Sequence, residues 1–369
     1  VAAAGAAMKI TIGEPWTISN SVTGEGEHIY PDLWKLQDGT LLLDYHLDHD
    51  MCPARRACLR SVDNGKTWTP DPPRVVREEA VVQLRDGTVL AYNGHAFPVT
   101  PGSKQSKGSM FRSDDGGKTF EGPIDVTVNM PRANREPIPP PDPKYEHYIA
   151  MVFWRSILEL PDGNLLAFMY GWWEGDTKYR AVAAISRDRG LTFDYLSTIG
   201  YDPNPDLGEY YEGFDEGILS WTAAGDILCV ARVGSFHSLR QTRSSDHGKT
   251  WSEPIILDPD LDPAAQSVLE DPADVGIASV NPDMLLMSNG VLACSFGRPG
   301  NSIMFDPTGT GDNWEKSIVV YWGGLTGYTC MLEIAPGKLL FVCDALGIDD
   351  ASGDKANCLR GVEITVERE

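Results

Sequence analysis

Two sets of polar and aromatic residues recur at fixed distances from six glycine turns. The turns are Asp38-Gly39, Asp86-Gly87, Asp162-Gly163, Ala224-Gly225, Asn289-Gly290 and Pro336-Gly337. Nine residues before the glycines stand Tyr30, Glu78, Trp154, Glu216, Asn281 and Tyr328. Seven or eight residues after them stand His46, His95, Tyr170, Arg232, Arg298 and Asp344. Because such side chains are unfavourable to bury without a function, we expect the two sets to meet at one site.

The residue types in these sets indicate a site for a sugar with an acidic group. Arg232 and Arg298 are donors well suited to a carboxylate. Tyr30, Trp154 and Tyr170 offer rings that can stack on sugar faces. The competing interpretation is a solvated channel mouth that binds no ligand.

The elements that must position these residues are β-hairpins. Each glycine turn lies between two apolar runs, for example 33–36 before Gly39 and 40–43 after it. A second motif, Ser-x-Asp-x-Gly-x-Thr followed by Trp or Phe, alternates with these turns. It begins at Ser61, Ser113, Ser186 and Ser244, and a degenerate fifth copy lies between Asp306 and Trp314. In this motif we expect the Asp to cap a tight turn and the Gly to take a positive φ, which predicts a second hairpin.

Two alternating hairpins per unit predict the fold class. Six such units with almost no helical periodicity between them indicate an all-β protein, a six-bladed β-propeller of four-stranded antiparallel blades. The strand near 9–12 is expected to pair beside 361–366 and close the ring. Residues 8–369 are therefore predicted to form a single propeller domain. Residues 1–7 are predicted to be a tail, either an expression scar ahead of Met8 or the end of a trimmed leader.

Three segments carry no strand pattern, namely 130–148, 201–211 and 258–274. Long loops in a compact domain are usually functional or disordered. The Pro-rich segment 130–148 is expected either to cover the site or to contact another subunit of a homo-oligomer. A surface decoration without a function is the equally weighted alternative.

The charge of the chain excludes several classes of partner. Lysine and arginine total 31 against 53 acids, a net charge of −22 among 369 residues, which repels nucleic acid and anionic membranes. No apolar run reaches the roughly 20 residues that span a bilayer. The expected partner is therefore a small molecule or glycan with an acidic group, bound at a local cluster of arginines.

Metal and cofactor sites are not predicted. The seven Cys residues are scattered without zinc spacing, and no phosphate-binding loop appears. His46-x-x-His49 with two neighbouring Asp residues lacks a third ligand group of typical spacing. No signal peptide is visible, so we expect a cytoplasmic protein, with a removed leader as the alternative.

The four eight-residue motifs resemble the Asp boxes (BNR repeats) of the sialidase (neuraminidase) superfamily, over nearly the whole chain. This resemblance implies that Tyr328, in Tyr328-Thr329-Cys330, is a nucleophile and that Glu216 is its partner. It also implies that Asp50, eleven residues before Ser61, is the acid/base residue. A Tyr hydroxyl with a pKa of about 10 is a poor nucleophile, so a carboxylate must take its proton. Most glycosidases use a carboxylate as the nucleophile, and sialidases are an exception because they use a tyrosine.

The same resemblance assigns substrate-binding residues and also shows a departure. Arg232 and Arg298 match two arginines of the family's triad, and Asp344 loosely matches a bracing carboxylate. The first triad arginine is absent, because Ile29 or its neighbour His28 stands in its place.

The remaining members of the two sets complete the expected site. Arg155 is a candidate replacement for the missing charge, with an ion pair to a neighbour such as Glu159 as the alternative. The other residues expected to line the substrate are Tyr30, Trp154, His46, His95 and Glu78.

The expected function is that of a retaining exo-glycoside hydrolase of sialidase type. It would remove a terminal sialic acid or a related acidic sugar. Two alternatives stay open. The missing arginine motivates the first, a hydrolase or lyase of uronic-acid-containing polysaccharide on the same propeller. The second is a sugar-binding propeller without catalysis, which would keep the arginines and aromatic residues but would not need Asp50.

Overall fold

The computed structural model describes most of the chain, namely residues 8–22, 24–48, 55–71, 80–135, 150–204, 211–234, 237–257, 280–298, 300–315, 317–323, 326–349 and 355–368. Every regular element in these ranges is a β-strand, which confirms the all-β prediction. The same ranges hold no helix long and apolar enough to cross a membrane. Of the three segments without a strand pattern, 136–148, 205–210 and 258–274 lie outside the described residues.

Three of the sheets in the described ranges are four-stranded and antiparallel, with strands in chain order. The first contains β3 (Ile29–Lys35), β4 (Leu41–His46), β5 (Arg56–Ser61) and β6 (Thr69–Pro70). The second contains β16 (Asp215–Trp221), β17 (Ile227–Arg232), β18 (Arg240–Ser244) and β19 (Ile255–Ile256). The third contains β20 (Val280–Leu286), β21 (Leu292–Gly297), β22 (Asn301–Asp306) and β23 (Ile318–Tyr321).

A nine-stranded sheet joins two further antiparallel series. The first series is β7 (Ala80–Gln83), β8 (Val89–Tyr92), β9 (His95–Pro98), β10 (Gln105–Ser113) and β11 (Glu121–Asn129). The second series is β12 (Met151–Glu159), β13 (Leu165–Gly171), β14 (Arg180–Ser186) and β15 (Thr192–Gly200). The pairings β12–β7 and β11–β15 are parallel and connect the two series at both ends. The hydrogen bonds therefore form fewer, larger sheets than six separate four-stranded ones.

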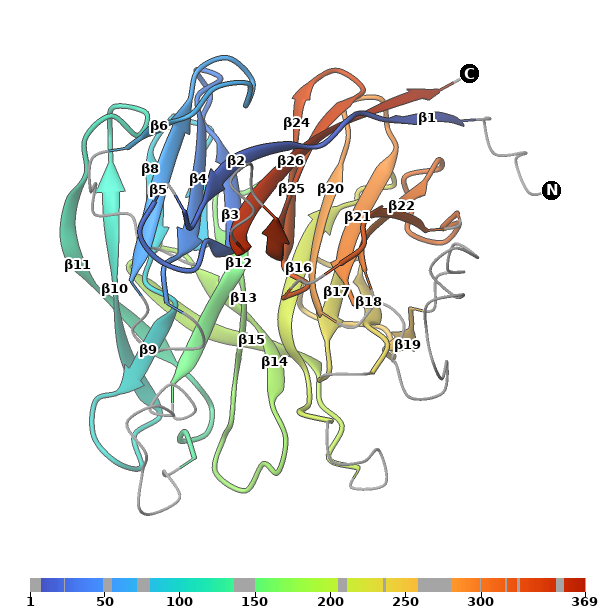
Figure 1. Cartoon of the computed structure of the whole chain (residues 1–369). Coiled ribbons are helices and arrows are strands. Elements are labelled where there is room, and N and C mark those ends of the chain that lie inside the picture. Colours follow the sequence, from blue (N-terminus) through green and yellow to red (C-terminus); the bar gives the residue numbers. More distant parts are fainter. Residues whose placement is uncertain are drawn as a thin grey trace.

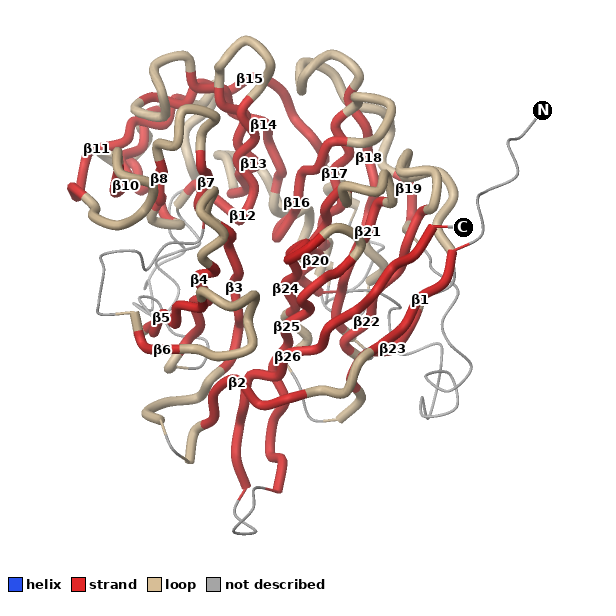
Figure 2. Tube along the Cα trace, turned by 90° about the horizontal axis from the view of Figure 1, so that it is seen from above, coloured by secondary structure: helices blue, strands red, loops and turns tan. Residues whose placement is uncertain are grey.

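The last sheet contains both ends of the described chain. Its strands are β24 (Thr329–Ala335), β25 (Lys338–Asp349), β26 (Lys355–Arg368), β1 (Met8–Ile12) and β2 (Trp16–Asn20). Lys9 pairs with Glu367 and Ile12 pairs with Ile364, so the predicted pairing of the first and last strands is confirmed. Figures 1 and 2 show β1 running beside β26.

The inner strands of the sheets surround a common axis. Figure 2 shows β3, β7, β12, β16, β20 and β24 nearest to that axis. Each pairs with the following strand through one of the six predicted glycine turns, and the glycines have φ between 72° and 92°. The six hairpins are therefore confirmed. Apolar clusters fill the spaces between neighbouring sheets, so the core is distributed around the ring.

The eight-residue motifs form the second hairpins and connect each strand series to its neighbour. In the copy at Ser186, the Ser Oγ accepts the Gly190 N–H at 2.8 Å and donates to Asp188 at 2.8 Å. The same Ser–Gly bond measures 2.8 to 2.9 Å in the other three copies. Gly190 lies against Tyr92 of the preceding series, whose hydroxyl donates to the Gly190 carbonyl at 3.3 Å. The motif thus needs glycine both for its φ of 88° and for this close approach.

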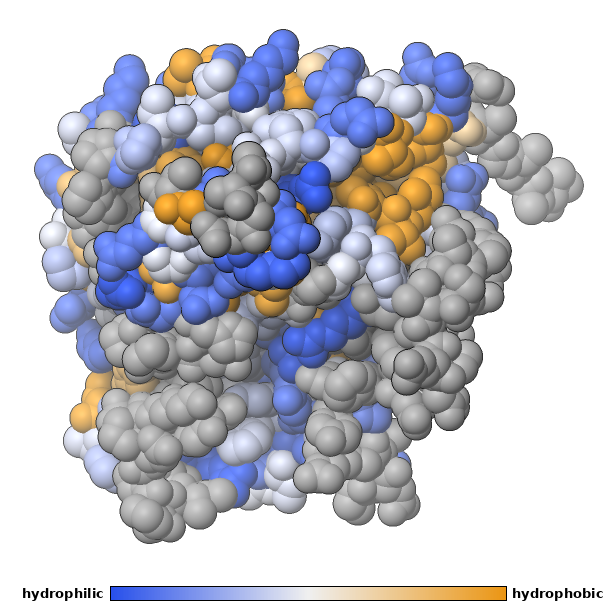
Figure 3. All heavy atoms as spheres, in the orientation of Figure 1, coloured by the Kyte–Doolittle hydropathy of each residue, from blue (hydrophilic) through white to orange (hydrophobic). Residues whose placement is uncertain are grey.

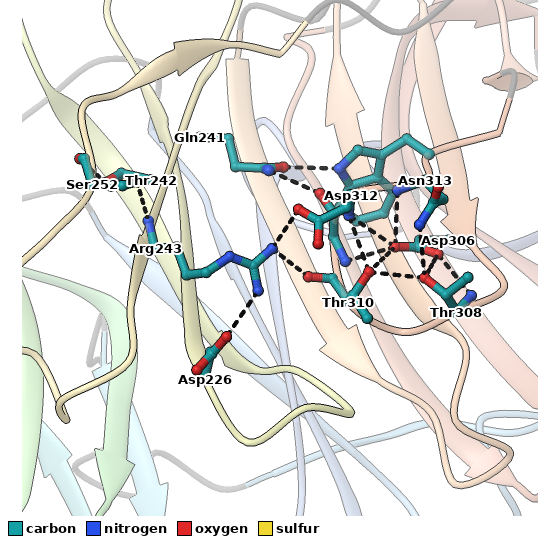
Figure 4. A network of polar contacts seen from close by, with 12 residues as sticks. Asp226, Gln241, Thr242, Arg243, Ser252, Asp306, Thr308, Thr310, Asp312 and Asn313 are labelled. Carbon is teal, nitrogen blue, oxygen red and sulfur yellow. Dashed lines mark hydrogen bonds and ion pairs between the residues drawn. The ribbon is translucent and has the colours of Figure 1, made fainter. Parts of the chain in front are cut away.

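The degenerate fifth copy builds its turn with a carboxylate. Asp306 replaces the serine, and its Oδ2 accepts the N–H groups of Gly311 at 2.6 Å and Asp312 at 3.1 Å (Figure 4). Arg243 of the neighbouring sheet reaches this turn and pairs with Asp312 at 2.8 Å and Asp226 at 3.3 Å. The fifth motif therefore also connects two adjacent sheets.

The outer surface agrees with the acidic composition. Figure 3 shows hydrophilic residues over much of the described surface on one face, and an apolar area beside β1 and β22. Partly buried apolar residues of β1 and β23 pack against the cluster beneath that area.

The close approach at Gly190 predicts unequal costs for two alanine substitutions. A Cβ added at Gly190 would lie 1.8 Å from Tyr92 Oη, whereas one at Gly163 meets nothing within 4 Å. Both positions have a positive φ, so Gly163→Ala should lower the free energy of unfolding by about 1–2 kcal/mol. Gly190→Ala adds overpacking and should cost about 2–4 kcal/mol. Urea unfolding measures both, and equal losses would show that the close contact between Gly190 and Tyr92 does not constrain the structure.

Candidate functional site

Four of the inner strands contain a residue other than glycine with a positive φ, in the first half of each strand or at its midpoint. Tyr30, Arg155, Glu216 and Asn281 have φ of 53°, 43°, 30° and 42°, and each lies at a break in the register with the paired strand. A positive φ is strained for these residue types, and a β-bulge changes the direction in which a side chain points. Such outliers often accompany functional sites. Three of these four residues, Tyr30, Glu216 and Asn281, belong to the set that precedes the glycine turns. The fourth residue, Arg155, directly follows Trp154, which is also in that set.

Tyr328 and Glu216 are in direct contact, although they are far apart in the sequence. The Tyr328 hydroxyl donates to Glu216 Oε1 at 2.5 Å. Burial, and then the negative charge of Glu216, raise the pKa of Tyr328 well above its ordinary value. The hydroxyl is therefore protonated at neutral pH, and the atom placed to accept its proton is Glu216 Oε1.

Arg232 donates to the same oxygen of the Glu216 carboxylate. Its Nη1 donates to Glu216 Oε1 at 2.8 Å, and its Nη2 donates to Glu212 at 3.0 Å. Asp215 lies 3.9 Å from Arg232 Nε. Burial would lower the pKa of Arg232, but the surrounding carboxylates, Glu216 first, raise it. Burial raises the pKa of Asp215, and the charges of Glu216 and Glu212 add to that effect.

An aromatic group covers the opposite side of Tyr328. The Tyr30 ring contacts the Tyr328 ring edge-on, with centroids 4.3 Å apart, and contacts His46 at 5.2 Å. Burial, and then the charge of Arg56, lower the pKa of His46 well below its ordinary value. His46 is therefore neutral at physiological pH, and this wall of the site carries no cation from β3 or β4.

Asp344 and Arg298 fix the turn that leads into β24. Asp344 accepts the Thr326 N–H at 2.9 Å, the Thr326 hydroxyl, and the Tyr30 N–H at 3.3 Å. Arg298 donates to the Thr326 carbonyl from Nε at 3.2 Å and from Nη2 at 3.0 Å. Both residues thus set the position of the segment two residues before Tyr328.

Arg155 lies in the interior of the ring, with a side chain that is only 8% exposed. Its Nη1 donates to the Thr329 carbonyl at 2.7 Å, and its Nη2 donates to the Pro31 carbonyl at 2.8 Å. Its Nε lies 2.6 Å from the Asp32 carboxylate. With the Asn281 amide oriented so that its oxygen faces the guanidinium, that oxygen accepts from Nη1 at 3.2 Å and from Nη2 at 2.9 Å.

These contacts give Arg155 a bracing role. It connects β12 to the residues that follow Tyr30 and Tyr328 in β3 and β24. The suggested partner Glu159 instead lies near Arg85, which donates to its main chain at 3.2 Å.

The structure gives local contacts for two of the remaining predicted site residues, and two others lie outside the described ranges. Trp154 packs against the cluster shared with β16, with its ring 6.1 Å from that of Tyr170. His95 stacks on Phe97 with centroids 6.0 Å apart. Asp50 and Glu78 lie outside the described residues. Within the described residues there is no group of three or more His, Cys, Asp or Glu that would hold a metal ion.

Comparison with known proteins gives the fold. No family model and no curated protein matches the sequence. A protein of unknown function from Dyadobacter fermentans DSM 18053 matches with a TM-score of 0.68 at 19% identity, over 97% of this chain and 99% of that chain. The Hadza microbial sialidase Hz136 matches with 0.64 at 16% identity, over 94% and 68%. An α-L-arabinanase from Penicillium chrysogenum, complexed with arabinobiose, matches with 0.60 at 16% identity, over 97% and 98%.

The chain has the fold of sialidases and arabinanases. At these identities the likeness concerns the fold alone. The resemblance predicts that His28 or Ile29 stands in place of the first triad arginine, and both residues are buried in the structure.

The sequence patterns did not indicate the carboxylates that neutralise the interior arginines. Asp32 and Asp44 lie directly opposite each other in neighbouring strands, and Arg56 donates to both. A signal was present, because Asp44 directly follows three leucines in a strand whose neighbouring residues are buried. Glu212 and Asp215 both precede Glu216 in the sequence, but only the structure shows that Arg232 contacts all three.

The contacts of Arg155 predict a large loss of stability on substitution. Arg155→Met leaves the Asp32 carboxylate and two carbonyls without this donor in the interior, so we expect a loss of about 3–5 kcal/mol in the free energy of unfolding. As a control, Lys338→Met removes an exposed ion pair with Glu363 and should cost less than about 1 kcal/mol. Urea unfolding tests both, and a loss for Arg155→Met no larger than that of the control would contradict the bracing role.

Proposed function

We propose that the protein is a retaining exo-glycoside hydrolase on a six-bladed β-propeller, with Tyr328 as the nucleophile. In this proposal the two series of the nine-stranded sheet, β7–β11 and β12–β15, are separate blades. The eight-residue motifs correspond to the Asp boxes of sialidases. The single observation that carries the proposal is the 2.5 Å contact between the Tyr328 hydroxyl and Glu216 Oε1. A tyrosine beside a carboxylate that can take its proton is an activated nucleophile.

The proposed reaction has two steps with balanced proton transfers. In the first step Tyr328 Oη gives its proton to Glu216 Oε1 and bonds to the anomeric carbon. The glycosidic bond breaks, and Asp50 protonates the leaving oxygen. In the second step Asp50 takes a proton from water, which attacks the anomeric carbon. Tyr328 Oη leaves and recovers its proton from Glu216, so the configuration is retained.

The proposed substrate is a terminal sialic acid or a related acidic sugar. Arg298 and Arg232 would contact its carboxylate, as the resemblance to sialidases implies. A neutral tyrosine nucleophile suits an anomeric carbon that carries a carboxylate, because an anionic nucleophile would be repelled. Arg232 also holds Glu216 as the base, so one guanidinium would serve both the substrate and the proton acceptor.

A second candidate is a glycosidase for a sugar without that carboxylate. It is favoured by the ring of Tyr30 and the neutral His46 on the side from which a third arginine is missing. The arabinanase from Penicillium chrysogenum shows that this fold also occurs in proteins named for a neutral sugar polymer. A panel of aryl sialoside, aryl glucuronide and aryl α-L-arabinofuranoside separates the two candidates. An unsaturated product that absorbs in the near ultraviolet would instead indicate a lyase.

Substitution at the proposed nucleophile should abolish most turnover of whichever substrate is active. We expect Tyr328→Phe to lower kcat/KM by at least about 10³-fold and Glu216→Gln by about 10²–10⁴-fold. Tyr195→Phe, which removes a hydroxyl that contacts Thr198 on β15, is the matched control and should keep wild-type activity. Initial-rate kinetics with the aryl substrate measures all three. Equal turnover by wild type and Tyr328→Phe would rule out the tyrosine mechanism.

A further inference from the structure

A groove of about 430 Å³ lies between two neighbouring sheets, outside the central cluster. The end of β15 and residues 201–202 line one side, and the start of β18 with residues 251–254 lines the other. Figure 2 shows that β15 and β18 belong to adjacent sheets. Tyr211 and Phe214, both buried, also line the groove. The proposed reaction uses none of these residues.

The groove contains a cation without a neutralising partner among the described residues. Arg240 is half-buried. Its Nη1 donates a hydrogen bond to the Ser238 carbonyl at 2.6 Å. Among the described residues, no carboxylate lies within 4.0 Å of its guanidinium. Burial lowers the pKa of Arg240, while Tyr211 and Asp202 act in the opposite direction. A partly buried charge without a partner is unfavourable, so a ligand that accepts its hydrogen bonds would stabilise it.

Two further polar groups face the same space. Tyr211 contacts Lys178 and His237 through its ring, and its hydroxyl makes no hydrogen bond to the described part of the chain. Asp202 accepts the Asn204 N–H through Oδ1 at 2.9 Å, which leaves Oδ2 without a partner in the described ranges. Asp202 and Arg240 both influence the pKa of Tyr211, so the three groups are close together although they are not bonded to one another.

The chemistry of these groups selects the class of ligand. An arginine donates, a carboxylate accepts, and a tyrosine hydroxyl does both, which is the complement of a ring with several hydroxyl groups. The lining carries two arginines, Arg180 and Arg240, and two carboxylates, Asp202 and Glu253, and this balance of charge favours a neutral ligand over an anion. Ligand sites combine concave shape with a few convergent polar groups and aromatic rings. Tyr201 and Trp251 both line this groove, and the Arg180 guanidinium lies 3.7 Å from the centroid of the Tyr201 ring.

We propose that this groove is a second carbohydrate site, which binds a neutral sugar residue of a glycan through Arg240, Tyr211 and Asp202. The segment that leads into β16 separates it from the centre, since Tyr211 lines the groove while the next residue, Glu212, pairs with Arg232. The sugar is either a remote unit of the hydrolysed chain or part of a second chain. Both sources present the same chemistry.

Binding is tested with the full chain carrying Tyr328→Phe, so that turnover does not interfere. The probes are D-galactose, D-glucose and L-arabinose, observed by saturation-transfer NMR titration. At least one should bind saturably with a Kd of about 1–10 mM. Tyr211→Phe removes a single hydroxyl and Asp202→Asn a single charge, and each should weaken binding at least about fivefold. Asp125→Asn, on the exposed face of β11, is the matched control and should leave the Kd unchanged.

Two results would overturn the proposal. One is the absence of saturable binding by any of the three sugars. The other is binding that persists unchanged in Tyr211→Phe and Asp202→Asn, with thermal unfolding confirming that both variants fold. Neither result depends on turnover, so failure of the second site and failure of the proposed reaction are distinguishable.

Kinetics with an active substrate identifies the source of the sugar. If the groove binds a remote unit of the hydrolysed chain, Tyr211→Phe raises KM for a long glycan at least about fivefold and leaves KM for a short aryl glycoside unchanged. If it binds a second chain, both KM values remain unchanged while the binding defect persists. Loss of kcat on the short substrate would instead assign Tyr211 to the centre and contradict a separate site.

Discussion

The centre of the ring depends on one buried guanidinium. Arg155 extends from β12 and contacts the main chain of β3 and β24 and the amide of Asn281 in β20. A buried cation is tolerated only when hydrogen bonds and a counter-charge replace its hydration, and here Asp32 supplies the charge. Its carbonyl acceptors, Pro31 and Thr329, directly follow Tyr30 and Tyr328. The spacing of the two tyrosine rings, which meet edge-on, is therefore coupled to the closure of the ring. The same contacts hold the strained backbone at the bulges in place.

The second constraint is electrostatic and concerns the contacts of the Glu216 carboxylate. Glu216 accepts from Tyr328 and from Arg232, so the same carboxylate oxygen receives two donors. Burial raises the pKa of Tyr328, which keeps its hydroxyl protonated. In the proposed mechanism this hydroxyl is the nucleophile and Glu216 takes its proton. Glu212 and Asp215 also lie within 4.0 Å of the same arginine, so one guanidinium is shared by three carboxylates.

The sequence predicted the parts of the fold that have local signals. Glycine turns between apolar runs defined the six hairpins, and their regular spacing placed Glu216 and Tyr328 in one set, whose side chains are indeed in contact. The role of Arg155 was not predictable, because its acidic partner Asp32 is remote in the chain while Glu159 is close and has suitable charge. The sequence also did not predict that two strand series join into one nine-stranded sheet. That joining depends on pairing between strands of different series, such as β11 with β15, and the repeats carry no signal for it. Asp50 and Glu78 lie outside the described residues, so their assignments stay predictions.

The proposed mechanism depends above all on covalent attachment of the sugar to Tyr328. The direct measurement is peptide mapping by mass spectrometry after the wild-type protein reacts with a fluorinated glycosyl fluoride of the sugar it hydrolyses, which slows breakdown of the intermediate. We expect one added glycosyl group on the peptide that contains Tyr328, and none in the Tyr328→Phe variant. A glycosyl group on Glu216, or hydrolysis with inversion and no adduct, would contradict the mechanism.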